Sequence, residues 1–268
     1  MKTALSIAGS DCSGGAGIQA DIKTFSAHGV FGMSVIVSVV AENTCRVLGW
    51  DAVRPPLIRA QIDAIYEDIG TDAVKIGMLP DTVTMETVAE KLAEYTPRCI
   101  VLDPVMYAKN GAALMERDAI DALKRTVIPR ADLVTPNIPE AEELAGFAIG
   151  GPADARRAAE KILALGCGAV LVKGGHGGTE AAEDLLFDGS NFRAFSAPRI
   201  HTRNTHGTGC TLSSAIAANL ALALPLEEAV EKAKAYVTAA IAHALDIGKG
   251  HGPTNHFYAL YEAAEKAG

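Results

Sequence analysis

The sequence lacks several features that would mark other classes of protein. Its five cysteines are scattered and form no CxxC pair, which argues against a disulfide framework or a zinc site and suits a reducing cytoplasm. There is no excess of positive charge: the formal net charge of −8 argues against nucleic acid or an anionic membrane surface as the main partner. The most apolar later stretch, residues 215–226, falls short of the ~20 apolar residues that span a bilayer. We therefore expect a cytoplasmic protein with a small-molecule ligand.

Low-complexity linkers and repeats of fixed length are also missing, so we expect one domain over residues 1–268. The hydrophobic fraction of 49% is ample for a substantial core. Short β-rich runs alternate with longer helical patterns almost throughout, which predicts βαβ crossovers and a mostly parallel sheet covered on both sides by helices. A turn at residues 188–191, between two apolar runs, predicts an antiparallel hairpin at one edge of that sheet. Apolar strands and flat edges make a homodimer plausible.

The expected elements follow from apolar periodicity. The predicted strands cover residues 5–8, 33–41, 73–76, 99–102, 133–134, 169–172, 185–187 and 192–195. The predicted helices cover residues 17–28, 57–69, 82–95, 117–127, 139–145, 154–165, 210–224, 226–245 and 254–266. Ligands of such sheets bind at the carboxyl ends of the strands, so the residues that follow each strand carry the functional signal.

A turn rich in glycine precedes one long run of small and apolar residues. Gly207 and Gly209 allow a tight bend, and the helix that follows contributes unpaired N–H groups and its positive dipole end. This combination predicts an anion site without any charged side chain. Cys210 lies in the first helical turn, where the pKa of a thiol is lowered. An equally consistent interpretation is a loop entering a core helix, with Cys210 as a small buried hydrophobe.

The loop after the first strand contains Gly15-Ala16-Gly17, which matches a GxGxxA pattern, and Glu42 ends the next strand. Together they resemble a dinucleotide-binding fingerprint. In that fingerprint the glycines follow the strand directly, whereas here residues 10–14 intervene. The longer loop fits a pocket wall better than a pyrophosphate turn. A carboxylate at the end of an apolar strand is costly unless it is paired, so Glu42 indicates a ligand, a cation or simply a surface turn.

Carboxylates and a lysine follow later strands. Asp103 and Glu140 are residue types that Mg²⁺ prefers, and Asn137 adds a carbonyl or orients a water. Lys173 ends a strand and precedes four glycines within residues 174–178, which suits a main chain that approaches phosphates beside a cation. Each residue also has a structural interpretation, as a turn, a helix N-terminus or a hairpin loop. Jointly they supply what phosphoryl transfer needs: positioning, Mg²⁺ and neutralisation of developing charge.

These motifs, in this order, resemble the hydroxymethylpyrimidine/phosphomethylpyrimidine kinases of the ribokinase-like superfamily. The resemblance is carried by IAGSD (7–11) with SGGAGIQAD (13–21), ENT (42–44), KIGML (75–79), DPVM (103–106), TPN (135–137) with EA (140–141), VKGGH (172–176) and NTHGTGCTLS (204–213). It implies a three-layer α/β/α fold and ATP-dependent phosphorylation of 4-amino-5-hydroxymethyl-2-methylpyrimidine, first to the monophosphate and then to the diphosphate.

The resemblance also implies roles for single residues. Gly207, Thr208, Gly209 and Cys210 would form the anion hole, with Cys210 at the position of the base. The remaining roles are Mg²⁺ support by Asp103, Asn137 and Glu140; ATP contacts by Lys173, Gly174 and Thr208; and a pyrimidine pocket of Gly9, Asp21, Glu42, Met78 and Val105.

One residue departs from the family pattern, which usually has Gln at position 42. An amide both accepts from an amino group and donates to the adjacent ring nitrogen, as Gln does to an adenine edge. Glu42 pairs with the same edge only if a proton is present on the carboxyl or on the ring nitrogen.

Three alternatives stay open at this point. A pyridoxal kinase shares the fold and the chemistry. An NAD-dependent oxidoreductase would use residues 15–17 and Glu42 but leaves Lys173 and residues 207–210 without a purpose. A lyase of this fold that acts on hydrated nicotinamide nucleotides is disfavoured because Cys stands at position 210, where sugar kinases of the superfamily carry Asp.

Overall fold

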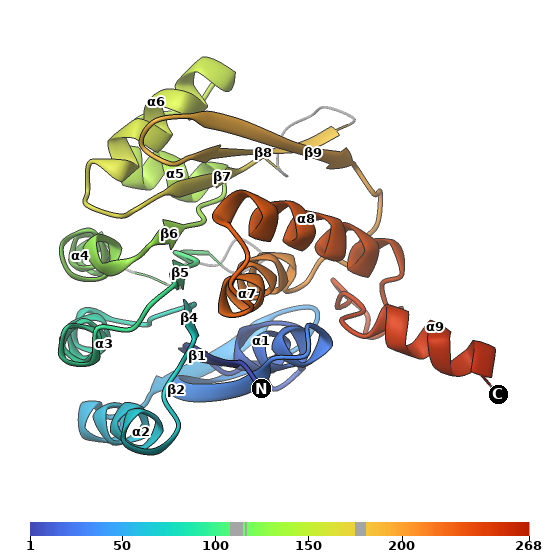
Figure 1. The fold of residues 1–268 in the computed structure, drawn as a ribbon, viewed down its shortest axis with the longest axis horizontal. Coiled ribbons are helices and arrows are strands. Elements are labelled where there is room, and N and C mark those ends of the chain that lie inside the picture. Colours follow the sequence, from blue (N-terminus) through green and yellow to red (C-terminus); the bar gives the residue numbers. More distant parts are fainter. Residues whose placement is uncertain (108–114, 116, 175–180, 268) are drawn as a thin grey trace.

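The computed structural model describes residues 1–107, 115, 117–174 and 181–267. One nine-stranded sheet runs through it (Figure 1). In spatial order its strands are β3 (Val47–Ala52), β2 (Phe31–Glu42), β1 (Thr3–Gly9), β4 (Ala73–Ile76), β5 (Ile100–Leu102), β6 (Leu133–Val134), β7 (Val170–Lys173), β8 (Ala181–Phe187) and β9 (Phe192–Pro198). The six strands from β2 to β7 are parallel, and β3, β8 and β9 add antiparallel pairs at the two edges.

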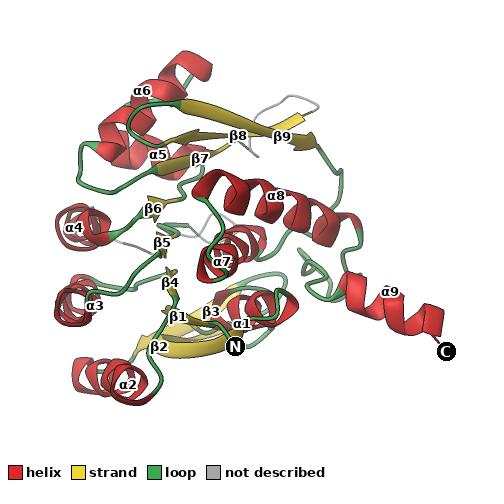
Figure 2. Cartoon of the chain, in the orientation of Figure 1, coloured by secondary structure: helices red, strands yellow, loops and turns green. Residues whose placement is uncertain are grey.

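Helices cover both faces of the sheet (Figure 2). One face carries α2 (Pro55–Asp68), α3 (Thr82–Tyr95), α4 (Arg117–Ala122), α5 (Ile138–Ala145) and α6 (Pro152–Leu163). The other face carries α1 (Gly17–Ala27), α7 (Thr208–Ala221) and α8 (Leu226–Ala242), and α9 (Tyr258–Ala267) lies at the chain's end. The predicted three-layer α/β/α architecture with a mostly parallel sheet is confirmed.

The central strands are apolar on both sides because each side faces a helix layer. Along β5, Val101 belongs to the core under α7, while Ile100 and Leu102 belong to the core under α3. The same alternation recurs in β1, β4, β6 and β7, as expected when successive side chains point to opposite faces. The sheet draws its strands from residues 3–198, and one domain over residues 1–268 stays a prediction.

Two parts of the fold differ from the sequence-based expectation. Strand β3 was not predicted: its residues are almost all exposed, and Gly49 and Asp51 weaken its β pattern. The helix expected over residues 117–127 is α-helical only to Ala122, continues as a π-helical turn, Leu123–Val127, and ends in the 3₁₀ turn Ile128–Arg130. Because β3 pairs antiparallel with β2, both edges of the sheet are antiparallel, not only the edge with the 188–191 turn.

Candidate active site

A cavity of about 770 Å³ lies where the carboxyl ends of the central strands meet the N-terminus of α7. Every site residue predicted from the sequence lines it except Asp21 and Gly174. The predicted residues on its wall are Gly9, Glu42, Met78, Asp103, Val105, Asn137, Glu140, Lys173, Gly207, Thr208, Gly209 and Cys210. Residues from seven strands and loops, far apart in the sequence, therefore converge on one space.

The anion loop, defined here as residues 207–210, opens helix α7. Gly207 is the N-cap residue and has a φ of 75°, a conformation that favours glycine. Among the described residues no side chain caps this helix. Thr208 N–H donates to Thr205 O at 3.4 Å, and the N–H groups of Gly209 and Cys210 remain available to a ligand. A Cβ atom placed on Gly209 would lie 3.3 Å from Asp103 Oδ2 and 3.5 Å from Lys173 Nζ. The loop is thus directly beside the ionic groups predicted to handle phosphate.

Lys173 and Asp103 form a nearly buried ion pair in the cavity wall, with Lys173 Nζ 2.6 Å from Asp103 Oδ1. Burial disfavours the ammonium ion, but Asp103 and Glu140 outweigh this effect and raise the pKa of Lys173. Burial raises the pKa of Glu140 to about 7; Lys173 opposes this rise and Asp103 adds to it. The cluster holds two carboxylates and one ammonium, so a cationic ligand beside it would be stabilised.

Asn137 and Glu140 form a capping box at the start of α5. Glu140 N–H donates to Asn137 Oδ1 at 2.9 Å, and Asn137 N–H donates to Glu140 Oε2 at 2.8 Å. The box fixes both side chains against the cavity and uses the single side-chain oxygen of Asn137 and one of the two carboxyl oxygens of Glu140. A metal ion here would therefore be held partly through water molecules, which is the mode that Mg²⁺ favours.

The protonation state of Cys210 is the opposite of the sequence-based expectation. The helix N-terminus predicted a lowered thiol pKa, but burial raises the pKa of Cys210 to about 11. Lys75 and the Gly17 main chain favour the thiolate, while Asp21 and Asp103 disfavour it. Desolvation therefore outweighs the favourable charges, and Cys210 is a neutral thiol near pH 7.

Asp21 does not line the cavity; it lies underneath, fully buried. Its carboxylate accepts from Lys75 Nζ at 2.8 and 2.9 Å, from Ser6 Oγ at 2.6 Å and from Ser214 Oγ at 2.7 Å. This network joins β1, β4, α1 and α7 below the anion loop. The structure therefore gives Asp21 a scaffolding position in place of the predicted contact with the pyrimidine.

Gly174 is also turned away from the cavity. Its N–H donates to Asp184 Oδ1 at 3.0 Å, and a Cβ atom on it would lie 1.9 Å from Glu183 O. Asp184 in turn accepts from Lys234 Nζ at 2.6 Å, and both side chains line the cavity. The predicted phosphate contact of the Gly174 amide is thus replaced by an internal one. The rest of that predicted loop, residues 175–178 with His176, lies outside the described residues.

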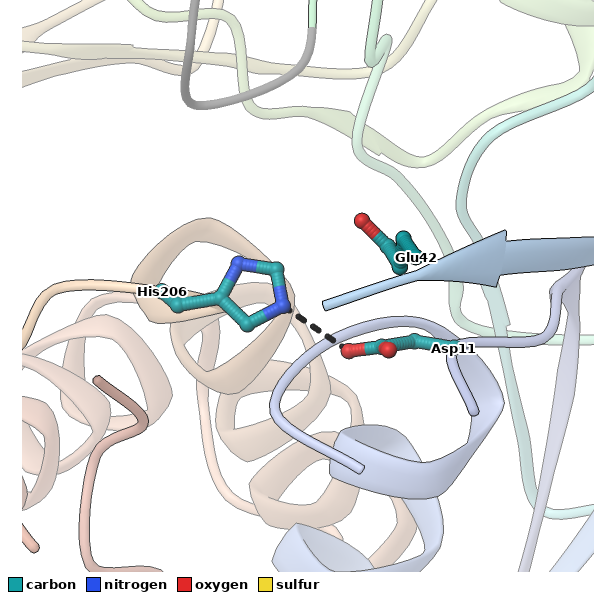
Figure 3. A group of neighbouring side chains, drawn as sticks. All are labelled: Asp11, Glu42 and His206. Atoms are coloured by element: carbon teal, nitrogen blue, oxygen red, sulfur yellow. Dashed lines mark hydrogen bonds and ion pairs between the residues drawn. The ribbon is translucent and has the colours of Figure 1, made fainter. Parts of the chain in front are cut away.

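Three side chains that come from distant segments meet beside the cavity, which two of them, Glu42 and His206, also line (Figure 3). Asp11, Glu42 and His206 each bring a polar atom within 4.8 Å of the others. His206 Nε2 lies 2.8 Å from Asp11 Oδ2. Burial raises the pKa of Glu42 to about 7, Asp11 adds to the rise and His206 opposes it. Glu42 therefore changes its protonation state near neutral pH.

The sequence interpretation gave no role to Asp11, His206 or Lys75. Lys75 had a signal, since a lysine inside the apolar strand AVKI requires a buried partner. Asp11 and His206 are 195 positions apart, so only the fold shows their contact. An apolar wall at the cavity's far end was also missed; it consists of Pro198, Ile200, Leu212, Val237 and Ile241.

The sequence matches the family model described as phosphomethylpyrimidine kinase over residues 11–255. The chain belongs to the phosphomethylpyrimidine kinase family. It is 52% identical to a hydroxymethylpyrimidine/phosphomethylpyrimidine kinase of Rhizobium meliloti over 258 residues, which cover 95% of this chain and 97% of that protein. It is 49% identical to the thiamine biosynthesis bifunctional protein ThiED of Geobacter sulfurreducens over 98% of this chain, which spans about half (54%) of that longer relative.

The fold of this chain is similar to that in a crystal structure of Bacillus subtilis pyridoxal kinase in complex with ADP. The superposition has a TM-score of 0.91 at 38% identity and covers 97% of this chain and 99% of that chain. The ribokinase-like fold expected from the motifs is thereby confirmed. Within the described residues, no helix combines the length and apolarity required to cross a bilayer.

Proposed function

We propose that this member of the phosphomethylpyrimidine kinase family transfers phosphate from ATP to 4-amino-5-hydroxymethyl-2-methylpyrimidine and then to the resulting monophosphate. The observation that carries the proposal is the shared cavity: the anion loop, the Lys173–Asp103 pair and all the predicted ring contacts except Asp21 line one space. Relatives that match nearly the whole chain bear the corresponding name.

The ring would lie between apolar and polar contacts at the first strands. Gly9, Met78 and Val105 offer flat, mostly apolar surface, and Glu42 offers the polar atoms that recognise a nitrogen edge. A Cβ atom on Gly9 would lie only 2.6 Å from Ser38 Oγ, so position 9 has no room for a side chain. This arrangement suits a planar aminopyrimidine whose hydroxymethyl group points toward the anion loop.

ATP would occupy the opposite half of the cavity. The apolar wall on α7, α8 and the segment after β9 has the composition expected around an adenine ring. Lys173 and the N–H groups of the anion loop would then contact the phosphates, with Thr208 beside them. The ADP complex of the similar pyridoxal kinase supports a nucleotide as the second ligand.

Magnesium fits the acidic cluster. Asp103, Glu140 and Asn137 would support the ion, partly through water, since the cluster holds two carboxyl groups beside the single ammonium of Lys173. Bound there, Mg²⁺ supplies neutralisation of charge on the nucleotide phosphates.

The chain's own groups would then position the reactants. We assign the anion loop to the moving phosphoryl group and Cys210 to the neighbourhood of the substrate hydroxyl, at the position of a base. Because a thiol with a pKa near 11 is rarely ionised at pH 7, Cys210 contributes mainly through position. This is compatible with phosphoryl transfer, in which positioning and electrostatic stabilisation dominate.

Mass analysis of the products formed from MgATP and the pyrimidine alcohol tests the proposal. We expect species that carry one and then two added phosphates. Absence of any phosphorylated product with the folded protein would refute it.

Pyridoxal kinase activity is the second candidate, favoured by the similarity to the ADP complex of that enzyme. Competition between pyridoxal and the pyrimidine alcohol for the same MgATP separates the two, and we expect the pyrimidine to have the higher kcat/KM. Cytoplasmic location and a homodimer remain part of this proposal as well.

A further inference from the structure

Two glycine-containing loops touch between the two halves of the cavity. A Cβ atom on Gly15 would lie 2.3 Å from His206 Cδ2, and one on Gly207 would lie 1.8 Å from Gly15 O. Neither position has room for a side chain. Gly15, the first glycine that resembles a dinucleotide fingerprint, therefore has another physical reason here, which is close contact with the segment that opens the anion loop.

Asp11 is the polar anchor of this contact. Its Oδ1 accepts from Ser13 N–H at 2.7 Å, and its Oδ2 accepts from Gly15 N–H at 3.0 Å and Ala16 N–H at 2.7 Å. The same Oδ2 lies 2.8 Å from His206 Nε2. Burial opposes ionisation of Asp11, but hydrogen bonds from His206, Ser13 and Ala16 outweigh it and hold the pKa of this carboxyl well below its usual range.

Because Asp11 is ionised and acts as an acceptor, His206 Nε2 carries the proton and donates it to the shared hydrogen bond. The geometry also argues against a metal ion among Asp11, Glu42 and His206. Three N–H groups already converge on Asp11 Oδ2, and a metal ion there would displace them. Asp11 and His206, which a dashed line joins in Figure 3, therefore form a hydrogen-bonded clamp rather than part of a cation site.

The clamp reaches both functional ends of the cavity. On one side, Cys12 follows Asp11, and its S–H donates to Glu42 O at 3.1 Å, which ties the clamp to the predicted ring contact. On the other side, His206 directly precedes Gly207. The His206 N–H also donates to Gly252 O at 3.0 Å, so its side chain and its main chain are both fixed. The orientation of the anion loop thus depends on where this imidazole is held.

We infer that His206 is a positioning residue: its Nε2–H, held by Asp11, aligns the anion loop with the bound ring alcohol for phosphoryl transfer. This inference rests on the proposed function. An interaction that aligns the phosphoryl site without contacting the ring acts on the transition state more than on ring binding. Loss of the contact should consequently lower kcat far more than it weakens binding of the alcohol.

Three substitutions test this role. His206→Leu removes the donor; His206→Gln keeps an N–H near the Nε2 position; His201→Leu is the matched control, since His201 is exposed and lies five positions earlier. For each, kcat is measured with MgATP, the Kd of the alcohol is measured by calorimetry without nucleotide, and inhibition by MgADP with aluminium fluoride reports on a mimic of the moving phosphoryl group.

We expect His206→Leu to lower kcat about 10- to 100-fold, the range for loss of one hydrogen bond to a charged group. Inhibition by the aluminium fluoride complex should weaken by a similar factor, while the Kd of the alcohol stays within about threefold of the control. His206→Gln should recover most of the lost kcat. If the Leu variant fails to fold, His206→Asn replaces it, because its N–H corresponds to Nδ1 and not to Nε2.

The inference is overturned if the Leu variant keeps the control's kcat, if ring affinity falls as much as kcat, or if Gln performs no better than Leu. Inactive wild-type protein would instead refute the proposed function. An active wild type with unaffected His206 variants would remove only the positioning role.

Discussion

Replacement of Glu42 by Gln should abolish a pH dependence of substrate binding that the wild type shows. With a pKa of about 7, the protonated fraction of Glu42 falls from about nine-tenths at pH 6 to about one-tenth at pH 8. Recognition of the ring's nitrogen edge needs one proton between the carboxyl and the ring nitrogen. Either a neutral carboxyl donates, or an ionised carboxylate accepts from a protonated ring.

The magnitude follows from that shared proton. We expect the wild-type KM for the pyrimidine alcohol to rise about tenfold from pH 6 to pH 8, equivalent to about 1.4 kcal/mol. An amide at position 42 donates and accepts without a proton, so the KM of Glu42→Gln should be nearly constant over this range. The charged or titratable groups that surround Glu42, which are Asp11, Cys12 and His206, are the same in both proteins.

Steady-state kinetics with saturating MgATP at several pH values provides the assay. Glu140 also titrates near pH 7, but its effect is common to both proteins and cancels in the ratio of their KM values. Parallel KM profiles for wild type and variant would show that Glu42 does not contact the ring, and would refute this reasoning.

Three further substitutions probe the scaffold around the site. Cys210→Ala should retain turnover within about 100-fold of the wild type, with the same pH profile below pH 9, because the thiol is neutral there. A loss of all turnover in a rapid-quench assay would show instead that Cys210 is an essential base. Lys75→Met leaves a buried carboxylate unpaired and should lower the free energy of unfolding by about 3–5 kcal/mol in urea titration. Lys2→Met, at an exposed ion pair, should lower it by at most about 1 kcal/mol. Equal losses would contradict the burial of the Lys75–Asp21 pair. Gly207→Ala combines a positive φ with a main-chain clash and should abolish product formation. Gly29 has a similar φ but open space around it. Gly29→Ala should therefore lose only about 1 kcal/mol of stability and keep its activity.

The sequence predicted the central layer well because its signal is strong there. The strand at residues 73–76 and the helix at residues 82–95 have the predicted bounds, since a short β-rich run interrupted only by Lys75 and a regular 3–4 spacing leave little ambiguity. Strand β3 has neither pattern: it is an exposed edge strand whose pairing with β2 depends on the hairpin. This strand forms through tertiary contacts, which the local sequence pattern does not predict.

Residues of the candidate site could be predicted where their position after a strand determines what they contact. They could not be predicted where burial determines their contacts or their pKa. Asp103 follows β5 and Lys173 ends β7, two parallel strands of one sheet with only β6 between them, so their contact is a consequence of topology. Asp21 was misplaced because the sequence does not show that Lys75 competes for its carboxylate. The Cys210 pKa was predicted in the wrong direction, because desolvation depends on how deep the helix start lies in the protein.

The contact between Gly252 and His206 has a consequence for how the protein is made. His251 N–H also donates to Thr44 O at 2.8 Å, so one late stretch of chain braces the ring side and the phosphate side together. A ribosome-bound chain that stops before this stretch can build most of the sheet yet lacks the brace. Catalytic competence should therefore emerge abruptly once residues 251 and 252 have been made, long after the central strands have paired.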